Sequence, residues 1–243
     1  LYEDDLEKYV EYNFRDVEIL KALDEKLQYI ALTLNLTYKG KHNFSEVYKS
    51  SKTHDGAISS YLLGQGIIPP AREKNAVTKK GYAGGYLFCP KAGLYRWMFD
   101  EDLTSLYPSI FMSLNMGKET LMARIIDSND RNNRLGLNDL KAMEPNKELL
   151  IERNHKQTYV KVKDLIEIIE EEKFTITANG VMFRTDIKSV LSIVLSRWFD
   201  ERKEYKDKMK KAFKSGDNTL GNYYYLMQYT FKILLNSLYG ATA

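Results

Sequence analysis

The strongest constraint on the fold is a pair of long helical patterns near the carboxyl end of the chain. Apolar residues recur every three or four positions over 190–213 and again over 219–238. The sequence Ser-Gly-Asp-Asn at 215–218 separates the two patterns, and these residue types favour a turn. Because so short a connection joins antiparallel helices, we expect two long antiparallel helices that bury a common apolar seam.

Helical patterns are also predicted in the first third of the chain. Apolar residues at spacings of three and four predict one helix over 3–35, and a second pattern runs from about 45 to 64. Glycines and prolines then interrupt regular structure. We therefore expect a domain or subdomain boundary within 66–80.

Two hairpins are predicted between these helical regions. Short apolar runs at 86–88 and 95–99, separated by a proline and a glycine, predict two strands with a tight connection. A second hairpin is expected over 174–183, because its central Asn-Gly pair tolerates positive φ. The polar stretch at 127–150 carries no pattern that assigns it.

Composition narrows the class of protein but not its function. A chain of 243 residues with 44% hydrophobic content can bury the core of one large or two small domains. Its net charge of +3 is too small to identify a nucleic-acid binder. No apolar run approaches the roughly 18 residues of a membrane span and no leader pattern opens the chain, which predicts a cytoplasmic protein.

The chain has one cysteine, and its first residue is not methionine. Cys89 has no second cysteine for an internal disulfide or a zinc knuckle, and we expect it to be a buried or half-buried thiol. His42, His54 and His155 have no partner at ligand spacing, so no chemical role is predicted for them. The ends at Leu1 and in an apolar helical pattern lead us to expect a part of a longer protein.

The stretch with the most chemical content is D-L-T-S-L-Y-P-S-I, which begins at Asp102. A strand that ends at this carboxylate, followed by a helix, would bring the carboxylate and free backbone N–H groups together. Such a place suits a polyphosphate held through Mg²⁺, with the amides of Ser105, Leu106 and Tyr107 on phosphate oxygens. The alternative, more common for this spacing alone, is that Asp102 only caps the helix.

A second stretch, K-I-L-L-N-S-L-Y-G, begins at Lys232. Lys232, Asn236 and Tyr239 lie at positions i, i+4 and i+7, so a helix presents them on one face, which could bind phosphate, sugar and base in order. Gly240 either permits close backbone approach or ends the helix. The alternative is an ordinary solvated amphipathic helix.

Basic residues are concentrated at 197–214, which holds eight Lys or Arg against four Asp or Glu. Arg202 and Lys206 are four apart on one helix face, so both can reach the same polyanion. The remaining lysines toward the end of the segment are expected to form a solvated face. These lysines are Lys208, Lys210, Lys211 and Lys214.

The stretch at Asp102 resembles the first palm motif of family B DNA polymerases, D-x-x-S-L-Y-P-S-I, with every fixed position matched. The resemblance implies that Asp102, together with the backbone oxygen of Leu103, binds the two catalytic Mg²⁺ ions. It also implies that Tyr107 packs under the deoxyribose and excludes a ribose 2′-OH.

The stretch at Lys232 resembles the fingers motif of the same family, K-x-x-x-N-S-x-Y-G, again without departure. This implies that Lys232 contacts the triphosphate, that Asn236 supports it, and that Tyr239 and Gly240 line the nascent base pair. The segment E-R-K-E-Y-K at 201–206 resembles the first fingers helix of T-even phage-like polymerases. Arg202 and Lys206, both within that segment, are therefore implied γ-phosphate contacts.

Two shorter matches lie upstream. Tyr12 and Asp16 fit the Y-x-x-x-D motif of the family's proofreading exonuclease, where the aspartate holds a metal, although this spacing is common in helices. Tyr82, Gly84 and Gly85 fit the Y-x-G-G element, which contacts the template strand in the family. The alternative there is a simple turn that enters a strand.

The resemblance implies a helix-rich α+β fold in three parts. Residues 1–70 would be the end of the exonuclease and linker helices, 71–188 the amino-terminal palm with short antiparallel strands, and 189–243 the fingers. The implied reaction is template-directed addition of deoxynucleotides to a primer by two-Mg²⁺ chemistry. The implied partners are primer–template DNA, deoxynucleoside triphosphates, the rest of the polymerase and, as a candidate, a sliding clamp, with no membrane.

One departure from the family bears on activity. No D-T-D motif follows the fingers stretch, so the second metal aspartate is missing and the chain alone is expected to be inactive. Two other readings stay open. One is a non-catalytic nucleic-acid-binding module with polymerase-like helices. The other is a fragment of a protein-primed family B polymerase, for whose extra insertion the stretch at 127–150 is short.

Overall fold

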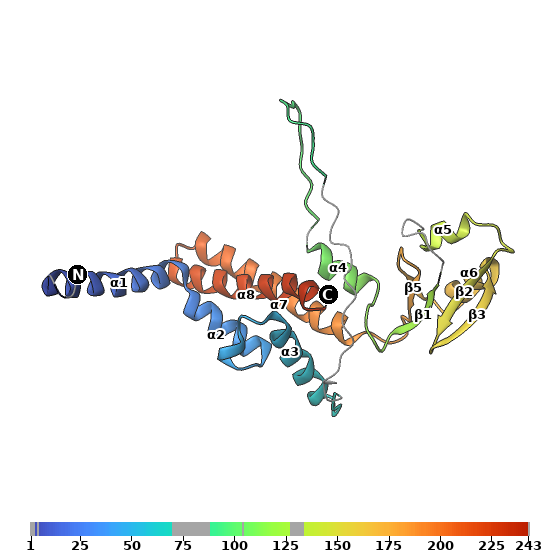
Figure 1. Ribbon diagram of the computed structural model, residues 1–243, viewed down its shortest axis with the longest axis horizontal. Coiled ribbons are helices and arrows are strands. Elements are labelled where there is room, and N and C mark those ends of the chain that lie inside the picture. The colour runs from blue at the N-terminus through green and yellow to red at the C-terminus, as the bar shows by residue number, and fades with distance from the viewer. Residues whose placement is uncertain (1–2, 4, 70–87, 104, 127–133, 243) are drawn as a thin grey trace.

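The computed structural model describes residues 3, 5–69, 88–103, 105–126 and 134–242. These residues form a helical body with an antiparallel five-stranded sheet at one end and a projecting helix at the other (Figure 1). The predicted helix-rich α+β class is confirmed. None of the helices in the described ranges combines the length and the apolarity needed to cross a bilayer.

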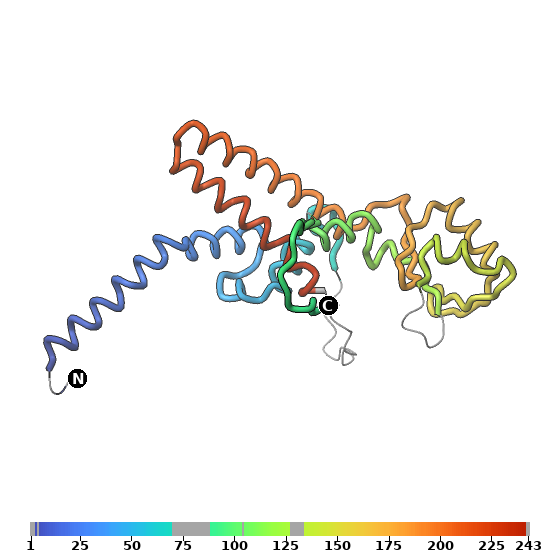
Figure 2. The backbone as a smooth tube through the Cα atoms, turned by 90° about the horizontal axis from the view of Figure 1, so that it is seen from above, coloured from blue at the N-terminus to red at the C-terminus, as the bar shows by residue number. Residues whose placement is uncertain are grey.

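The centre of the body is the predicted helical hairpin, formed by α7 (Val190–Lys214) and α8 (Asn218–Thr242). The two helices run antiparallel along most of their length (Figures 1 and 2). Next to the turn that joins them the two helices approach closely, because a Cβ on Gly221 would lie 2.6 Å from the Phe213 ring. Their buried seam consists of Val194, Leu195, Trp198, Phe231, Leu234, Leu235 and Leu238. Burying each of these large side chains stabilises the fold by about 1.5–3 kcal/mol.

Two shorter helices pack against the end of this hairpin that lies away from its connecting turn. They are α2 (Tyr29–Gly40) and α3 (Ser50–Gly64), which are joined through a short 3₁₀ turn, η1 (Phe44–Glu46). The buried His54 of α3 ties them to α8, since its Nε2 lies 3.0 Å from the Leu234 carbonyl and its Nδ1 lies 2.7 Å from the Ser50 carbonyl. The Trp198 ring of α7 meets His54 edge-on at 5.8 Å. This histidine therefore has a packing role.

The prediction of one helix over 3–35 was wrong, because the chain breaks at Gln28. That residue has φ 56°, a left-handed conformation that ends α1 (Leu6–Leu27), and its N–H donates to the Asp24 carbonyl. The Asp24 carboxylate then accepts from the N–H of Ile30 and begins α2. α1 has no buried residue and projects from the body (Figures 1 and 2).

The sheet has the strand order β3-β2-β1-β5-β4 and is antiparallel throughout. Its strands are β1 (Leu121–Ile125), β2 (Glu148–Arg153), β3 (Lys156–Lys161), β4 (Thr175–Ile176) and β5 (Val181–Phe183). The predicted hairpin at 174–183 is confirmed as β4 and β5, and Gly180 in its turn has φ 77°. Two helices pack against the strands: α5 (Leu137–Lys141) and α6 (Val162–Glu171). The stretch left unassigned at 127–150 thus contributes α5 and the start of β2.

The hairpin predicted at 86–99 was wrong for the part that the structure describes. Residues 88–103 contain no strand and extend away from the body before returning to it (Figure 1). Because none of these residues pairs with a strand of the described chain, their apolar side chains stay in solvent, and Trp97 is 98% exposed with φ 61°. Cys89 is exposed as well, so the expectation of a buried thiol was also wrong. Residues 86 and 87 lie outside the described ranges.

Candidate functional site

The start of α4 (Leu106–Ser113) is the local framework of the site. Ser105 caps this helix in a left-handed conformation, φ 53°, and its carbonyl accepts from the N–H of Ser109 at 2.9 Å. Asp102 lies outside the helix and is exposed, so the alternative that it caps α4 was wrong, as was the strand expected to end at it. The N–H groups of Leu106 and Tyr107 fall in the first turn, where a helix offers no internal acceptor. This turn is therefore suited to an anion.

A buried asparagine fixes α4 relative to α7. The Nδ2 of Asn115 donates to the Arg184 carbonyl at 2.7 Å and to the Ile187 carbonyl at 2.8 Å. Its Oδ1 accepts from the N–H of Ser189, the N-cap of α7, at 2.8 Å. Sequence reasoning missed Asn115, because an asparagine after a helix carries no signal of its distant partners.

Two contacts join the stretch at 102–110 to the helical hairpin. The rings of Tyr107 and Tyr239 stack with centroids 4.6 Å apart and an interplanar angle of 18°. The Nη1 of Arg202 donates to the Ser105 Oγ at 3.3 Å, across 97 residues of sequence. The start of α4 therefore meets both α7 and α8, and three predicted nucleotide contacts, Tyr107, Arg202 and Tyr239, converge on it.

Arg202 combines charge with partial burial. Burial lowers the pKa of its guanidinium below the ordinary value, yet an arginine stays protonated at any working pH. Its Nε is buried and has no hydrogen-bond partner among the described residues. A cationic donor without an acceptor is costly in an interior, and an oxyanion at this place would remove that cost.

The other predicted cations and amides of the site are exposed. Lys232, Asn236 and Gly240 lie on α8 and are solvent-accessible, as is Lys206 on α7. α8 continues to Thr242, so Gly240 does not end the helix. A Cβ at Gly240 would meet no described atom within 4 Å, which leaves this part of the helix open to a ligand.

Other predicted site residues are not brought together by the described structure. Asp16 lies on the exposed, projecting α1. Asp102 and Leu103 are exposed at the end of the segment that precedes α4. Within the described ranges no three His, Cys, Asp or Glu side chains group as a metal site. Tyr82, Gly84 and Gly85 lie outside those ranges.

The donor set at Asp102 fits Mg²⁺ in part. A carboxylate and a backbone carbonyl, from Asp102 and Leu103, are the hard oxygen ligands that this ion takes. Mg²⁺ commonly uses one or two carboxylates and completes its shell with phosphate oxygens and water. The described chain therefore offers one part of a magnesium site, to which a bound triphosphate would add ligands.

Comparison with known proteins decides the family. The sequence model of DNA polymerase family B matches residues 48–243. The chain belongs to DNA polymerase family B. This confirms the resemblance carried by the stretches that begin at Asp102 and Lys232, and the match covers every described element from α3 onward.

Two phage proteins are among the relatives. A DNA-directed DNA polymerase of Enterobacteria phage T4 is 36% identical over 121 residues, which are 50% of this chain and 13% of that protein. A DNA-directed DNA polymerase of Escherichia phage RB69 is 26% identical over 220 residues, 89% of this chain and 21% of that protein. This chain therefore spans only about a fifth or less of the length of these relatives.

The fold has a counterpart among solved structures. The family B DNA polymerase from the hyperthermophilic archaeon Pyrobaculum calidifontis superposes with a TM-score of 0.54 at 19% sequence identity. The superposition covers 90% of this chain and 23% of that chain. At this identity the likeness shows a shared fold.

Proposed function

We propose that this chain forms the nucleotide-binding face of a DNA-directed DNA polymerase and supplies one of its metal-binding carboxylates. In this assignment 189–243 is the fingers, 71–188 is the amino-terminal palm, and 1–70 is the end of the exonuclease domain with linker helices. Membership of family B and the phage relatives support the assignment.

The observation that carries the proposal is the convergence on the start of α4. The Ser105–Arg202 hydrogen bond and the Tyr107–Tyr239 stack join three sequence stretches that the family resemblance assigns to one nucleotide. A helix start offers N–H groups to phosphate, and a guanidinium offers several N–H donors in a fixed fork. One deoxynucleoside triphosphate could occupy both.

The proposed roles follow from charge and reach. Lys232 and Lys206 place ammonium groups on the triphosphate, and Arg202 binds its oxygens with the guanidinium. Asn236 adds an amide beside Lys232, one helical turn away. These groups neutralise charge and position the substrate, which is most of what a protein contributes to phosphoryl transfer.

The aromatic pair would set the shape of the sugar and base pocket. Tyr107 is half of a stacked pair, so its ring is held in one orientation rather than free to rotate away. A fixed ring under the sugar would exclude a 2′-hydroxyl by contact. Tyr239 and Gly240 would then line the nascent base pair.

Magnesium and DNA complete the proposed site. When bound, two Mg²⁺ ions would stabilise the attacking 3′-oxygen and the leaving pyrophosphate. Asp102 and the Leu103 carbonyl would hold them from this chain, and the second aspartate would come from another part of the polymerase. Primer–template DNA would contact Tyr82, Gly84 and Gly85, and a sliding clamp is a further candidate partner.

A primer-extension assay tests this function. We expect the purified 243-residue chain to add no nucleotides to a primed template with Mg²⁺, because no second metal aspartate motif follows the stretch at Lys232. Mixing it with a fragment that supplies the carboxy-terminal palm and thumb should give extension. In that mixture Asp102→Asn should abolish extension and Lys210→Ala, an exposed lysine outside the site, should leave it unchanged. Robust extension by the chain alone, or by the Asp102→Asn mixture, would contradict the proposal.

A further inference from the structure

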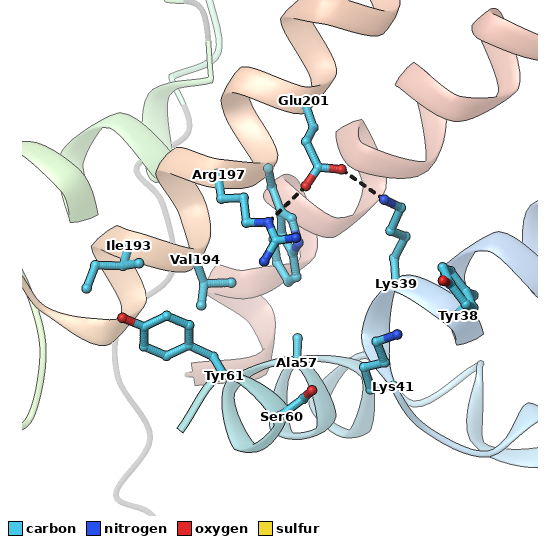
Figure 3. Close-up of a pocket in the computed structure, with 11 residues that line it drawn as sticks. Tyr38, Lys39, Lys41, Ala57, Ser60, Tyr61, Ile193, Val194, Arg197 and Glu201 are labelled. Carbon is cyan, nitrogen blue, oxygen red and sulfur yellow. Dashed lines mark hydrogen bonds and ion pairs between the residues drawn. The ribbon is translucent and has the colours of Figure 1, made fainter. Parts of the chain in front are cut away.

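A separate pocket opens between α2, α3 and α7. Its volume is about 280 Å³, just below the range of roughly 300–1,000 Å³ that is typical of small-molecule sites. The α7 residues that line it include Trp198 as well as Arg197 and Glu201 (Figure 3). None of the residues proposed to bind the nucleotide, Arg202 and Lys232 among them, lines this pocket.

Apolar and cationic residues both line the pocket. The apolar residues are Ala57, Tyr61, Ile193 and Val194 (Figure 3). Three cations also line it, Lys39 and Lys41 from α2 and its C-cap and Arg197 from α7 (Figure 3). Such a lining suits a ligand that has one charged end and one apolar body.

A carboxylate of the chain already lies among the cations. Glu201 accepts from the Lys39 Nζ at 2.8 Å and from the Arg197 Nε at 3.1 Å (Figure 3). The side chains of Lys39 and Glu201 are each only 23% exposed, so this pair is more strongly coupled than a surface ion pair. The Lys39–Glu201 contact also joins α2 to α7.

Glu201 does not pair with every cationic donor that lines the pocket. The terminal nitrogens of Arg197 donate to no described residue, and Lys41 rests over the Tyr38 ring with its Nζ 4.2 Å from the centroid. Three cations therefore face one carboxylate at the pocket. An added anion would meet Arg197 and Lys41 without first breaking the contact between Lys39 and Glu201.

We propose that this pocket binds a small organic anion, with a phosphate or carboxylate group on a flat apolar body. The anionic group lies against Arg197 and Lys41, and the apolar body lies against Tyr61 and Val194. Glu201 and the anion share Arg197, while Lys39 stays paired with Glu201.

Fluorescence of Trp198 tests the site directly. The chain has two tryptophans, and Trp97 is 98% exposed, so Trp97→Phe leaves Trp198 as the only reporter. We expect deoxyadenosine monophosphate to change the Trp198 emission saturably, and deoxyadenosine or inorganic phosphate alone to bind at least about tenfold more weakly. No saturable change, or phosphate alone binding equally well, would overturn the proposal.

Variants locate the binding. Arg197→Gln and Lys41→Gln should each weaken deoxyadenosine monophosphate binding by about tenfold, whereas Glu201→Gln should strengthen it because a competing carboxylate is removed. Lys210→Ala and Lys232→Ala should leave it unchanged, and circular dichroism confirms that each variant is folded. Unaltered affinity in both glutamine variants of the cations, or loss of the signal in Lys232→Ala, would refute the assignment.

Discussion

At Arg202, partial burial disfavours the charge that the guanidinium carries. Its guanidinium reaches the Ser105 Oγ, but its buried Nε has no partner among the described residues and its pKa is lowered by burial. Structural stability alone does not favour this arrangement, since a buried donor without an acceptor is destabilising. The proposed nucleotide would supply the acceptor that the Arg202 Nε lacks.

Arg202→Met is therefore expected to leave the melting temperature unchanged or to raise it by a few degrees. The apolar side chain fills the same space without an unsatisfied donor. Differential scanning fluorimetry measures the change, with Phe231→Ala as the comparison. Phe231 is fully buried, so its truncation should cost about 3–5 kcal/mol. A loss of stability in Arg202→Met as large as that in Phe231→Ala would show that Arg202 is structural.

At the level of helices and strands, periodicity predicted the long helical hairpin but not the break at Gln28, and turn chemistry predicted some turns and missed others. The hairpin of α7 and α8 follows from its apolar spacing, and the turn at Gly180 follows from an Asn-Gly pair. The turn between β2 and β3 was missed, because Asn154 and His155 both adopt positive φ without the glycine that usually signals it. At Gln28 the left-handed break had no sequence signal either.

The two turns give opposite predictions for the free energy of unfolding. His155→Gly should stabilise the protein by up to about 1 kcal/mol, because glycine adopts φ 60° without the penalty of a side chain. Gly180→Ala should destabilise it by about 1–3 kcal/mol, since φ is 77° and the new Cβ would lie 3.0 Å from atoms of Ile125 and Leu135. Urea unfolding measures both. Equal effects of the two substitutions would contradict the assignment of the turns.

The family was predictable from two sequence stretches, but the contacts between those stretches were not. The stretches at Asp102 and Lys232 could be recognised because they match every fixed position of two family B motifs. Their meeting point could not, because the Tyr107–Tyr239 stack depends on how α4 crosses the hairpin. That crossing is set by Asn115, whose partners lie 69 to 74 residues away in the sequence.

At the scale of the whole molecule, α1 differs from the helical body because it contributes no side chain to a buried core. α1 has no buried residue, and one of its faces exposes large apolar side chains such as Leu6, Phe14 and Val17. We propose that the rest of the polymerase covers this face. An apolar helix face of this extent is expected to have a partner.

Removal of 6–27 should therefore leave the body intact. Because α1 contributes nothing to the buried cores, the melting temperature of the shortened chain should stay within about 2 °C of the parent, on a scale where 1 kcal/mol corresponds to roughly 2–4 °C. The shortened chain should also be more soluble, since exposed apolar surface is removed. A fall of many degrees would show that α1 is part of the folded unit.

The central claim is that α4, α7 and α8 together bind one nucleotide. A double-mutant cycle on dATP affinity tests this claim most directly. With Mg²⁺ present, Arg202→Met on α7 and Lys232→Ala on α8 should each weaken dATP binding by about 10- to 100-fold. The double variant should show coupling of about 0.5 kcal/mol or more, as expected for groups that share a ligand. Lys210→Ala should bind like the parent. Unchanged dATP affinity in Lys232→Ala, with Lys210→Ala as the reference, would contradict the account.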